Sequence, residues 1–117
     1  MTQWIDPDDL RRAIDSHSAI TVVDVRGLSE FFNGPLGRLP EAINVPLPEL
    51  RACLGALERR ASAEIVVVSR TEVRSARAAE QLDAAGFEHV AVLRGGMESW
   101  RRFGYTCLAA PASRSDE

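Results

Sequence analysis

Short apolar runs rich in β-branched residues recur along the chain, and they predict its strands. The runs are Ile20–Val25, Ala42–Val45, Ile65–Val68 and Val90–Leu93. Each is too short for a helix and is bounded by polar residues, glycine or proline. Because the runs are nearly continuous rather than alternating, both faces of each strand are expected to be buried.

Segments with helical character lie before and between these runs. A helix is expected from Pro7 to about Ser16, with Asp6 as its N-cap and proline at its first position. A second is expected to begin at Pro48, and it places Leu50, Cys53, Leu54 and Leu57 on one apolar face. An alanine-rich helix is expected from Ser75 to Ala85, with Gly86 as its C-cap, and a short one after Gly95-Gly96 that carries Met97 and Trp100.

The alternation of strands and helices defines the expected fold class. It predicts an α/β domain in three layers, with a mostly parallel sheet of about five strands flanked by helices. The 117 residues fit one domain, which we place at residues 1–108. The polar segment 109–117 is expected to be a disordered tail.

Composition narrows the possible partners. The net charge is −3, which gives no basic face for nucleic acid. No apolar stretch is as long as a membrane span, and the first residues do not form a signal peptide, so we expect a cytoplasmic protein without a membrane partner. All 14 basic residues are arginine. An anion site would therefore consist of guanidinium groups and backbone amides.

The chain has two cysteines, Cys53 and Cys107, and two histidines, His17 and His89. Their wide spacing does not match a zinc site, so we expect neither a metal nor a cofactor. Cys53 is expected to be an inert core residue on the face of a helix. Cys107 is expected to be an exposed free cysteine, with a redox or persulfide-accepting thiol as the alternative.

The segment Ser69–Arg74 is the candidate for chemistry, because it follows a predicted strand and precedes a predicted helix. Ligands of open α/β sheets bind beyond the carboxyl ends of the strands. Backbone N–H groups of a tight loop can form an anion nest there, helped by the helix N-terminus and by Arg70 and Arg74. Taken alone, the loop is more typical of an ordinary strand-to-helix turn.

Sequence pieces around this loop occur in an order that strengthens the case for a site. They are Ile5–Leu10 (IDPDDL), Val22–Arg26 (VVDVR), Glu30-Phe31, Leu39–Leu47 (LPEAINVPL), Arg74–Ala79 (RSARAA) and Leu93–Trp100 (LRGGMESW). Together they resemble the rhodanese family over about Ile5 to Tyr105. The resemblance implies a sulfurtransferase fold, in which a loop cysteine takes sulfur from a donor such as thiosulfate, holds it as a persulfide and passes it to an acceptor.

Aligning these pieces places the family's nucleophilic cysteine at Ser69. The six positions from Ser69 to Arg74, with Thr71, Glu72 and Val73 between the arginines, match the short loop of sulfurtransferases rather than the longer loop of related phosphatases. The sequence departs from the family in having serine at position 69, a carboxylate at Glu72 where a small residue is usual, and Arg38 where histidine is frequent. The carboxylate of Glu72 is expected to place negative charge at the anion site. The resemblance also implies that Asp24 and Arg26 brace the loop, although an ordinary structural ion pair explains them equally well.

Serine at position 69 changes the chemistry. A thiol with a pKa near 8.5 becomes a thiolate readily, whereas a hydroxyl is a far weaker acid and oxygen forms no persulfide. Serine catalysis needs an adjacent base, and the sequence places neither His17 nor His89 beside the loop.

Three functions remain open on the sequence. The preferred one is a rhodanese-like module that does not transfer sulfur but binds a small anion, such as sulfate or thiosulfate, or a protein partner. The alternative is an active sulfurtransferase, with a protein sulfur donor or acceptor, whose cysteine was replaced by serine. The third is an interaction domain without an occupied pocket. The natural codon for residue 69 would separate the first two.

Overall fold

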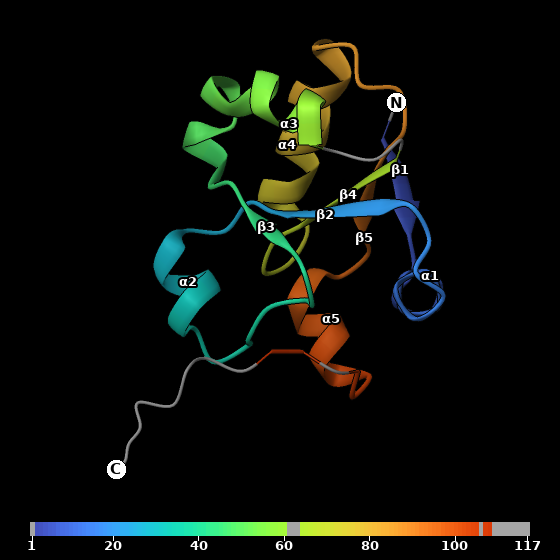
Figure 1. Cartoon of the computed structure of the whole chain (residues 1–117). Coiled ribbons are helices and arrows are strands. Elements are labelled where there is room, and N and C mark those ends of the chain that lie inside the picture. Colours follow the sequence, from blue (N-terminus) through green and yellow to red (C-terminus); the bar gives the residue numbers. More distant parts are fainter. Residues whose placement is uncertain (1, 61–63, 106, 109–117) are drawn as a thin grey trace.

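The computed structural model describes residues 2–60, 64–105 and 107–108, and its centre is one sheet of five parallel strands (Figure 1). The spatial order of the strands is β1-β5-β4-β2-β3. Their bounds are Gln3–Ile5 for β1, Ile20–Asp24 for β2, Ile43–Asn44 for β3, Glu64–Val68 for β4 and Val90–Leu93 for β5. The expected α/β class with a parallel sheet of about five strands is confirmed.

The strand order reverses at the centre of the sheet, between β2 and β4, and this is its topological switch point. After β2 the chain adds β3 on one side, and it then crosses back to place β4 on the other side of β2. The register of β4 against β2 pairs Val68 with Asp24, so the two strands end level. Loops that leave neighbouring strands in opposite directions open a crevice at their carboxyl ends, where ligands of open α/β sheets bind.

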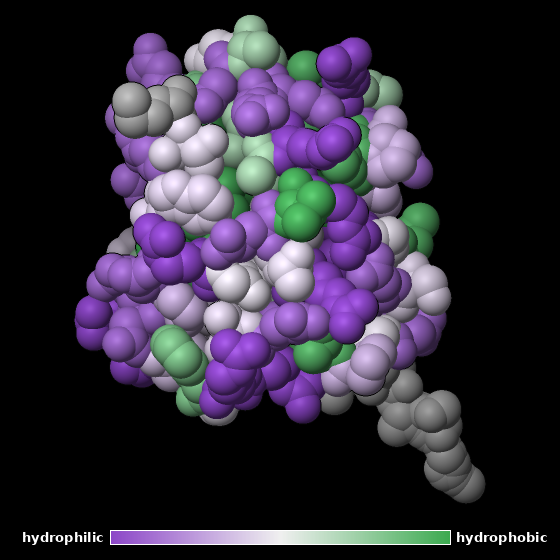
Figure 2. Space-filling model, turned by 180° about the vertical axis from the view of Figure 1, so that it is seen from behind, coloured by the Kyte–Doolittle hydropathy of each residue, from purple (hydrophilic) through white to green (hydrophobic). Residues whose placement is uncertain are grey.

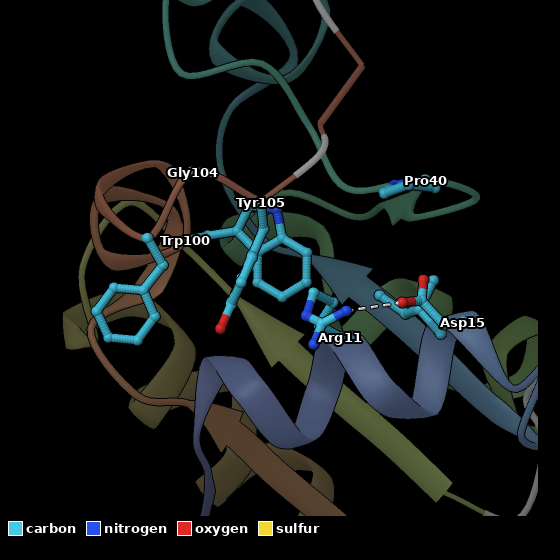
Figure 3. A pocket seen from close by; sticks show the side chains of 8 residues that line it. Arg11, Asp15, Pro40, Trp100, Gly104 and Tyr105 are labelled. Atoms are coloured by element: carbon cyan, nitrogen blue, oxygen red, sulfur yellow. Dashed lines mark hydrogen bonds and ion pairs between the residues drawn. The ribbon is translucent and has the colours of Figure 1, made fainter.

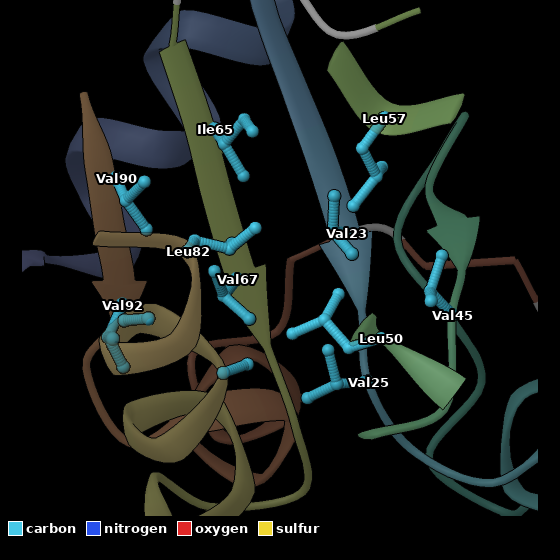
Figure 4. Packing of buried hydrophobic residues seen from close by; sticks show 12 residues of the cluster. Val23, Val25, Val45, Leu50, Leu57, Ile65, Val67, Leu82, Val90 and Val92 are labelled. Atoms are coloured by element: carbon cyan, nitrogen blue, oxygen red, sulfur yellow. The ribbon is translucent and has the colours of Figure 1, made fainter. Parts of the chain in front are cut away.

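One face of the sheet is covered by α3 (Leu54–Arg60) and α4 (Val73–Ala84), as Figure 1 shows. Alternate side chains of the strands point to this face. They include Val23 in β2, Val25 directly after β2, and Ile65 and Val67 in β4 (Figure 4). Val90 and Val92 from β5 and Leu50, Leu57, Ala78, Ala79 and Leu82 from the covering segments complete this core.

The other face is covered by α1 (Pro7–Asp15) and α5 (Gly96–Arg102). The residues between those of the first face point here, namely Val22 from β2 and Val66 and Val68 from β4. Leu10 of α1 and Met97 and Trp100 of α5 pack against them and are almost fully buried. Two buried faces explain why the strand sequences are nearly continuous apolar runs.

Several elements differ from those expected. The segment after Pro46 forms two 3₁₀ turns, Leu47–Glu49 and Arg51–Cys53, before α3, so a single helix from Pro48 was wrong. The edge strand β1 and the short helix α2 (Leu28–Asn33) were not predicted. Asp6 is extended at the start of α1, but its side chain makes no capping hydrogen bond and instead accepts one from Arg94 at 2.9 Å.

The surface is mainly polar on the face seen in Figure 2, with apolar side chains in small groups. Among the described residues, no helix is long and apolar enough to span a membrane. In the same part of the chain, no three His, Cys, Asp or Glu side chains are grouped so as to hold a metal ion. The predicted tail lies outside the described residues.

Candidate functional site

Ser69 lies at the carboxyl end of β4, and its side chain is enclosed by the turn that follows. The residue is 1% exposed. Its hydroxyl is 3.0 Å from the Ser75 hydroxyl oxygen and 3.2 Å from the carbonyl oxygen of Thr71, and it donates its one proton to either of them. The Ser69 oxygen accepts the backbone N–H of Ser75 at 3.1 Å. The loop thus curls around the side chain of residue 69.

The carbonyl side of the loop is fastened to the start of α5. The backbone N–H groups of Met97 and Glu98 donate to the carbonyl oxygens of Ser69 and Arg70, at 2.9 and 3.1 Å. Gly96 has φ +63°, and a Cβ atom there would overlap the carbonyl oxygens of Thr71, Ser69 and Arg70. Only glycine permits both this backbone conformation and this close approach. The Gly95-Gly96 pair therefore fixes the loop as well as starting α5.

The amide side of the loop is left open. No backbone N–H of residues 70–74 donates a hydrogen bond within the described part of the chain. Helix α4 begins at Val73, two residues earlier than expected, so Val73 and Arg74 belong to its first turn. Free N–H groups at a helix start attract negative charge, so the anion nest expected at Ser69–Arg74 stays a prediction that these N–H groups would serve.

Both arginines of the loop already have carboxylate partners. Arg70 donates to Glu98 at 2.8 Å, and Arg74 forms a two-pronged ion pair with Glu30 at 2.7 and 3.0 Å. The hydrogen bonds from Arg74 lower the pKa of Glu30, and the hydrogen bond to Glu30 raises the pKa of Arg74. An incoming anion must compete with these two carboxylates for the guanidinium groups.

Glu72 does not point into the loop as the sequence suggested. Its carboxylate accepts the backbone N–H of Gly95 at 2.6 Å, so it ties the loop to the segment before α5. Glu72 is also absent from the lining of the cleft beside the loop. The expectation that it places negative charge in an anion site is therefore not supported by its position.

Asp24 and Arg26 form an ion pair beneath the site. Both side chains are 1% exposed, and the guanidinium contacts the carboxylate at 2.8 to 3.1 Å. Arg26 also donates to the carbonyl oxygen of Gly37 at 2.7 Å. Asn44, which the sequence did not single out, donates to the backbone carbonyls of Asp24 and Arg26 at 3.0 and 2.9 Å. These contacts fix the end of β2, which lies beside Val68 at the start of the Ser69–Arg74 loop.

Arg38 lies apart from these groups. Its backbone forms an antiparallel bridge with Leu108, and its guanidinium lies over the rings of Phe31 and Phe32, 5.5 and 5.8 Å from their centroids. Arg38 is not among the residues that line the cleft beside the loop. The contacts of Arg38 therefore join its segment to Leu108 and stack its guanidinium on aromatic rings, and its supporting role at the loop stays a prediction.

A cleft of about 300 Å³ opens beside the loop. Its charged walls come from Arg26, from Glu30, and from the Arg70–Glu98 pair, and its apolar wall from Pro35 and Leu36. Glu98 was not predicted as a site residue, because nothing in its local sequence distinguishes it from any exposed helical carboxylate.

The histidines and cysteines lie away from the cleft. The carbonyl oxygen of His89 accepts the N–H of Ile65 at the start of β4, whereas Ser69 follows the other end of that strand. His17 follows the end of α1. Cys53 is half-buried against the core, as expected. Cys107 is also half-buried and packs against the core under α5, so the expectation that it is exposed was wrong.

The structure thus combines a parallel α/β sheet with a tight loop at the carboxyl end of its strand β4. The family model of the rhodanese-like domain matches residues 6–103. A sulfurtransferase from Allochromatium vinosum is 26% identical over 109 residues, which are 93% of this chain and 97% of that protein.

Solved structures agree with this match. A rhodanese-related protein from Thermoplasma volcanium has a TM-score of 0.76 and 34% identity, over 89% of this chain and 95% of that chain. A thiosulfate sulfurtransferase from Pseudomonas aeruginosa shares the fold, with a TM-score of 0.80 and 23% identity over 94% of this chain and 21% of that chain. The chain belongs to the family of rhodanese-like domains.

Proposed function

We propose that Ser69 occupies the position of the family's nucleophilic cysteine, and that the domain with this serine binds a small anion without transferring sulfur. The observation that supports this most directly is the enclosure of the Ser69 hydroxyl by Ser75 and by the turn carrying Thr71. A sulfur atom in this position would receive the N–H of Ser75 and face the start of α4.

Serine in this setting has no route to catalysis by itself. Within the described part of the chain, its oxygen has a backbone carbonyl, a backbone N–H and another hydroxyl within hydrogen-bond distance, and none of these is a general base. A backbone nest favours a thiolate because a thiol ionises near pH 8.5, whereas an alcohol remains protonated at any physiological pH.

Anion binding by the loop is expected to be weak. The free N–H groups of residues 70–74 favour an anion, but the charges of Arg70 and Arg74 are balanced by Glu98 and Glu30. We expect a dissociation constant on the order of millimolar for sulfate or thiosulfate, which corresponds to a binding free energy of about −4 kcal/mol.

A comparison of the chain with its Ser69→Cys variant tests the assignment. In the variant, the cysteine thiolate would attack the outer sulfur of thiosulfate, form a persulfide and release sulfite, and cyanide would then remove that sulfur as thiocyanate. We expect thiocyanate from Ser69→Cys and none above the uncatalysed rate from the unchanged chain or from Ser69→Ala. Thiocyanate formation by the unchanged chain that persists when Cys53 and Cys107 are both replaced by serine would refute the proposal.

A further inference from the structure

A second hollow lies between α1 and the end of α5, away from the loop at Ser69. Its volume is about 440 Å³, which is within the range of small-molecule sites. It shares no lining residue with the cleft beside the loop. Neither the proposed anion site nor its ion pairs account for this pocket.

One wall of the pocket is a chain of aromatic rings. The ring of Tyr105 lies edge-to-face against Trp100, with 5.1 Å between centroids, and against Phe103, with 5.7 Å. Figure 3 shows Pro40 across the opening from Trp100 and Tyr105. A flat ring that enters between an aromatic wall and a proline can stack on both, which favours planar ligands over bulky aliphatic ones.

The base of the pocket holds an arginine with an unused edge. Arg11 pairs with Asp15 through Nη1 at 3.0 Å, as the dashed line in Figure 3 marks, and its guanidinium lies 5.2 Å from the centre of the Tyr105 ring. Its Nε atom is shielded from water and has no acceptor among the described residues. The side chain is 41% exposed, so it can turn this edge toward the opening without disturbing the core.

The unused edge of the Arg11 guanidinium and the charge balance between Arg11 and Asp15 indicate the kind of ligand. Nε and the second terminal nitrogen of arginine form a fork that fits two adjacent acceptor atoms. Among the described residues that line the pocket, only Arg11 and Asp15 are charged, and they neutralise each other. We propose that this pocket binds a small neutral heteroaromatic ring that offers two adjacent hydrogen-bond acceptors on one edge. This inference is independent of the anion site at Ser69.

Guanosine is a suitable probe, since O6 and N7 of guanine form such an edge and pair with the arginine fork. Binding can be followed by the fluorescence of Trp100 in a Trp4→Phe background, because Trp4 is the other tryptophan and lies on the edge strand β1. We expect a saturable change with guanosine, and weaker binding by at least about tenfold with Arg11→Met. Arg12→Met is the matched control, since Arg12 is an exposed neighbour paired with Asp9, and it should leave binding unchanged.

Two further ligands and one further variant separate the outcomes. Adenosine, which has an amino donor in place of O6, should bind more weakly than guanosine. Tyr105→Leu removes part of the aromatic wall and should weaken guanosine binding. This variant provides a second test of the site if Arg11→Met does not fold. Backbone NMR shifts in the unchanged chain should appear at residues 11–15, 40 and 100–105 and not at 69–76. Benzoate binding as tightly as guanosine would overturn the preference for a neutral ring. The absence of a saturable response, or equal loss with Arg12→Met, would overturn the site.

Discussion

The backbone N–H of Ser75 donates to the side-chain oxygen of Ser69 at 3.1 Å, although the two residues are six positions apart. Ser75 also lies within 3.0 Å of that oxygen through its own hydroxyl, which donates onward to the carbonyl of Glu72 at 3.3 Å. Residue 69 thus sits inside a short relay of hydrogen bonds at the start of α4. This relationship makes the identity of the atom at position 69, oxygen or sulfur, decisive for the function.

Glu72 should support the loop rather than oppose an anion. If the carboxylate of Glu72 pointed into the loop, Ser69→Cys combined with Glu72→Gly would exceed Ser69→Cys in sulfur transfer. Because the carboxylate of Glu72 accepts the N–H of Gly95 at 2.6 Å, removing it should loosen the loop instead. We therefore expect Ser69→Cys with Glu72→Gly to be less active than Ser69→Cys alone, measured as thiocyanate formed from thiosulfate and cyanide.

Glu72→Gln in the Ser69→Cys background is the control, since it keeps an acceptor oxygen for Gly95. It should retain most of the activity of Ser69→Cys. Higher activity in both Glu72 variants would show instead that negative charge at this position limits the reaction.

Breaking the buried pair of Asp24 and Arg26 should strongly destabilise the fold. Asp24→Asn leaves the Arg26 guanidinium, which is 1% exposed, without its countercharge. We expect a loss of about 3–5 kcal/mol in the free energy of unfolding, because an uncompensated charge then remains in the core. Urea denaturation measures it, with Asp9→Asn as the control, because the exposed Asp9–Arg12 pair should be worth less than about 1 kcal/mol.

If Asp24→Asn does not fold, Asp24→Leu combined with Arg26→Met provides a second measurement. Removing both charges should cost less than removing one, since no buried charge is left alone. A double variant that is less stable than Asp24→Asn would contradict the role assigned to the pair.

The ion pair of Glu30 and Arg74 should make stability depend on pH. Hydrogen bonds from Arg74 hold the pKa of Glu30 below its ordinary value of 4.5. The pair therefore contributes fully above pH 4.5, and its contribution is lost as the pH falls through the lower pKa of the folded state. At neutral pH, Glu30→Gln should cost about 0.5–1 kcal/mol, a value discounted because both side chains are more than a third exposed.

Thermal unfolding of the chain and of Glu30→Gln between pH 3 and pH 7, roughly the range in which carboxylates titrate, measures this dependence. The difference between the two proteins should be largest at neutral pH and shrink in acid. A difference that is constant over this range would mean that Glu30 stabilises the domain through packing alone.

The sequence predicted the sheet and the position of the loop because both rest on local patterns. The run Ile65–Val68 and the polar segment after it predict a strand that ends at Val68, directly before Ser69, and the structure confirms the strand. The sequence could not show that Glu30 would reach Arg74 across 44 positions, or that Glu72 would turn to Gly95, because such partners depend on how loops meet in space. The edge strand β1 was missed since three residues with one tryptophan carry no period.

Sulfate binding at the loop is expected to depend on the carboxylate that holds Arg70. In the unchanged chain, Arg70 is paired with Glu98 at 2.8 Å. Glu98→Gln removes this countercharge and should tighten sulfate binding, whereas Arg70→Gln should weaken sulfate binding. Sulfate titration followed by backbone NMR shifts measures both, and shifts should be confined to residues 69 to 76 and should weaken as sodium chloride is added. If those amides do not respond in either variant while other regions do, the loop does not bind anions. The cleft lined by Pro35 and Leu36 would then be better explained as a contact for a protein partner.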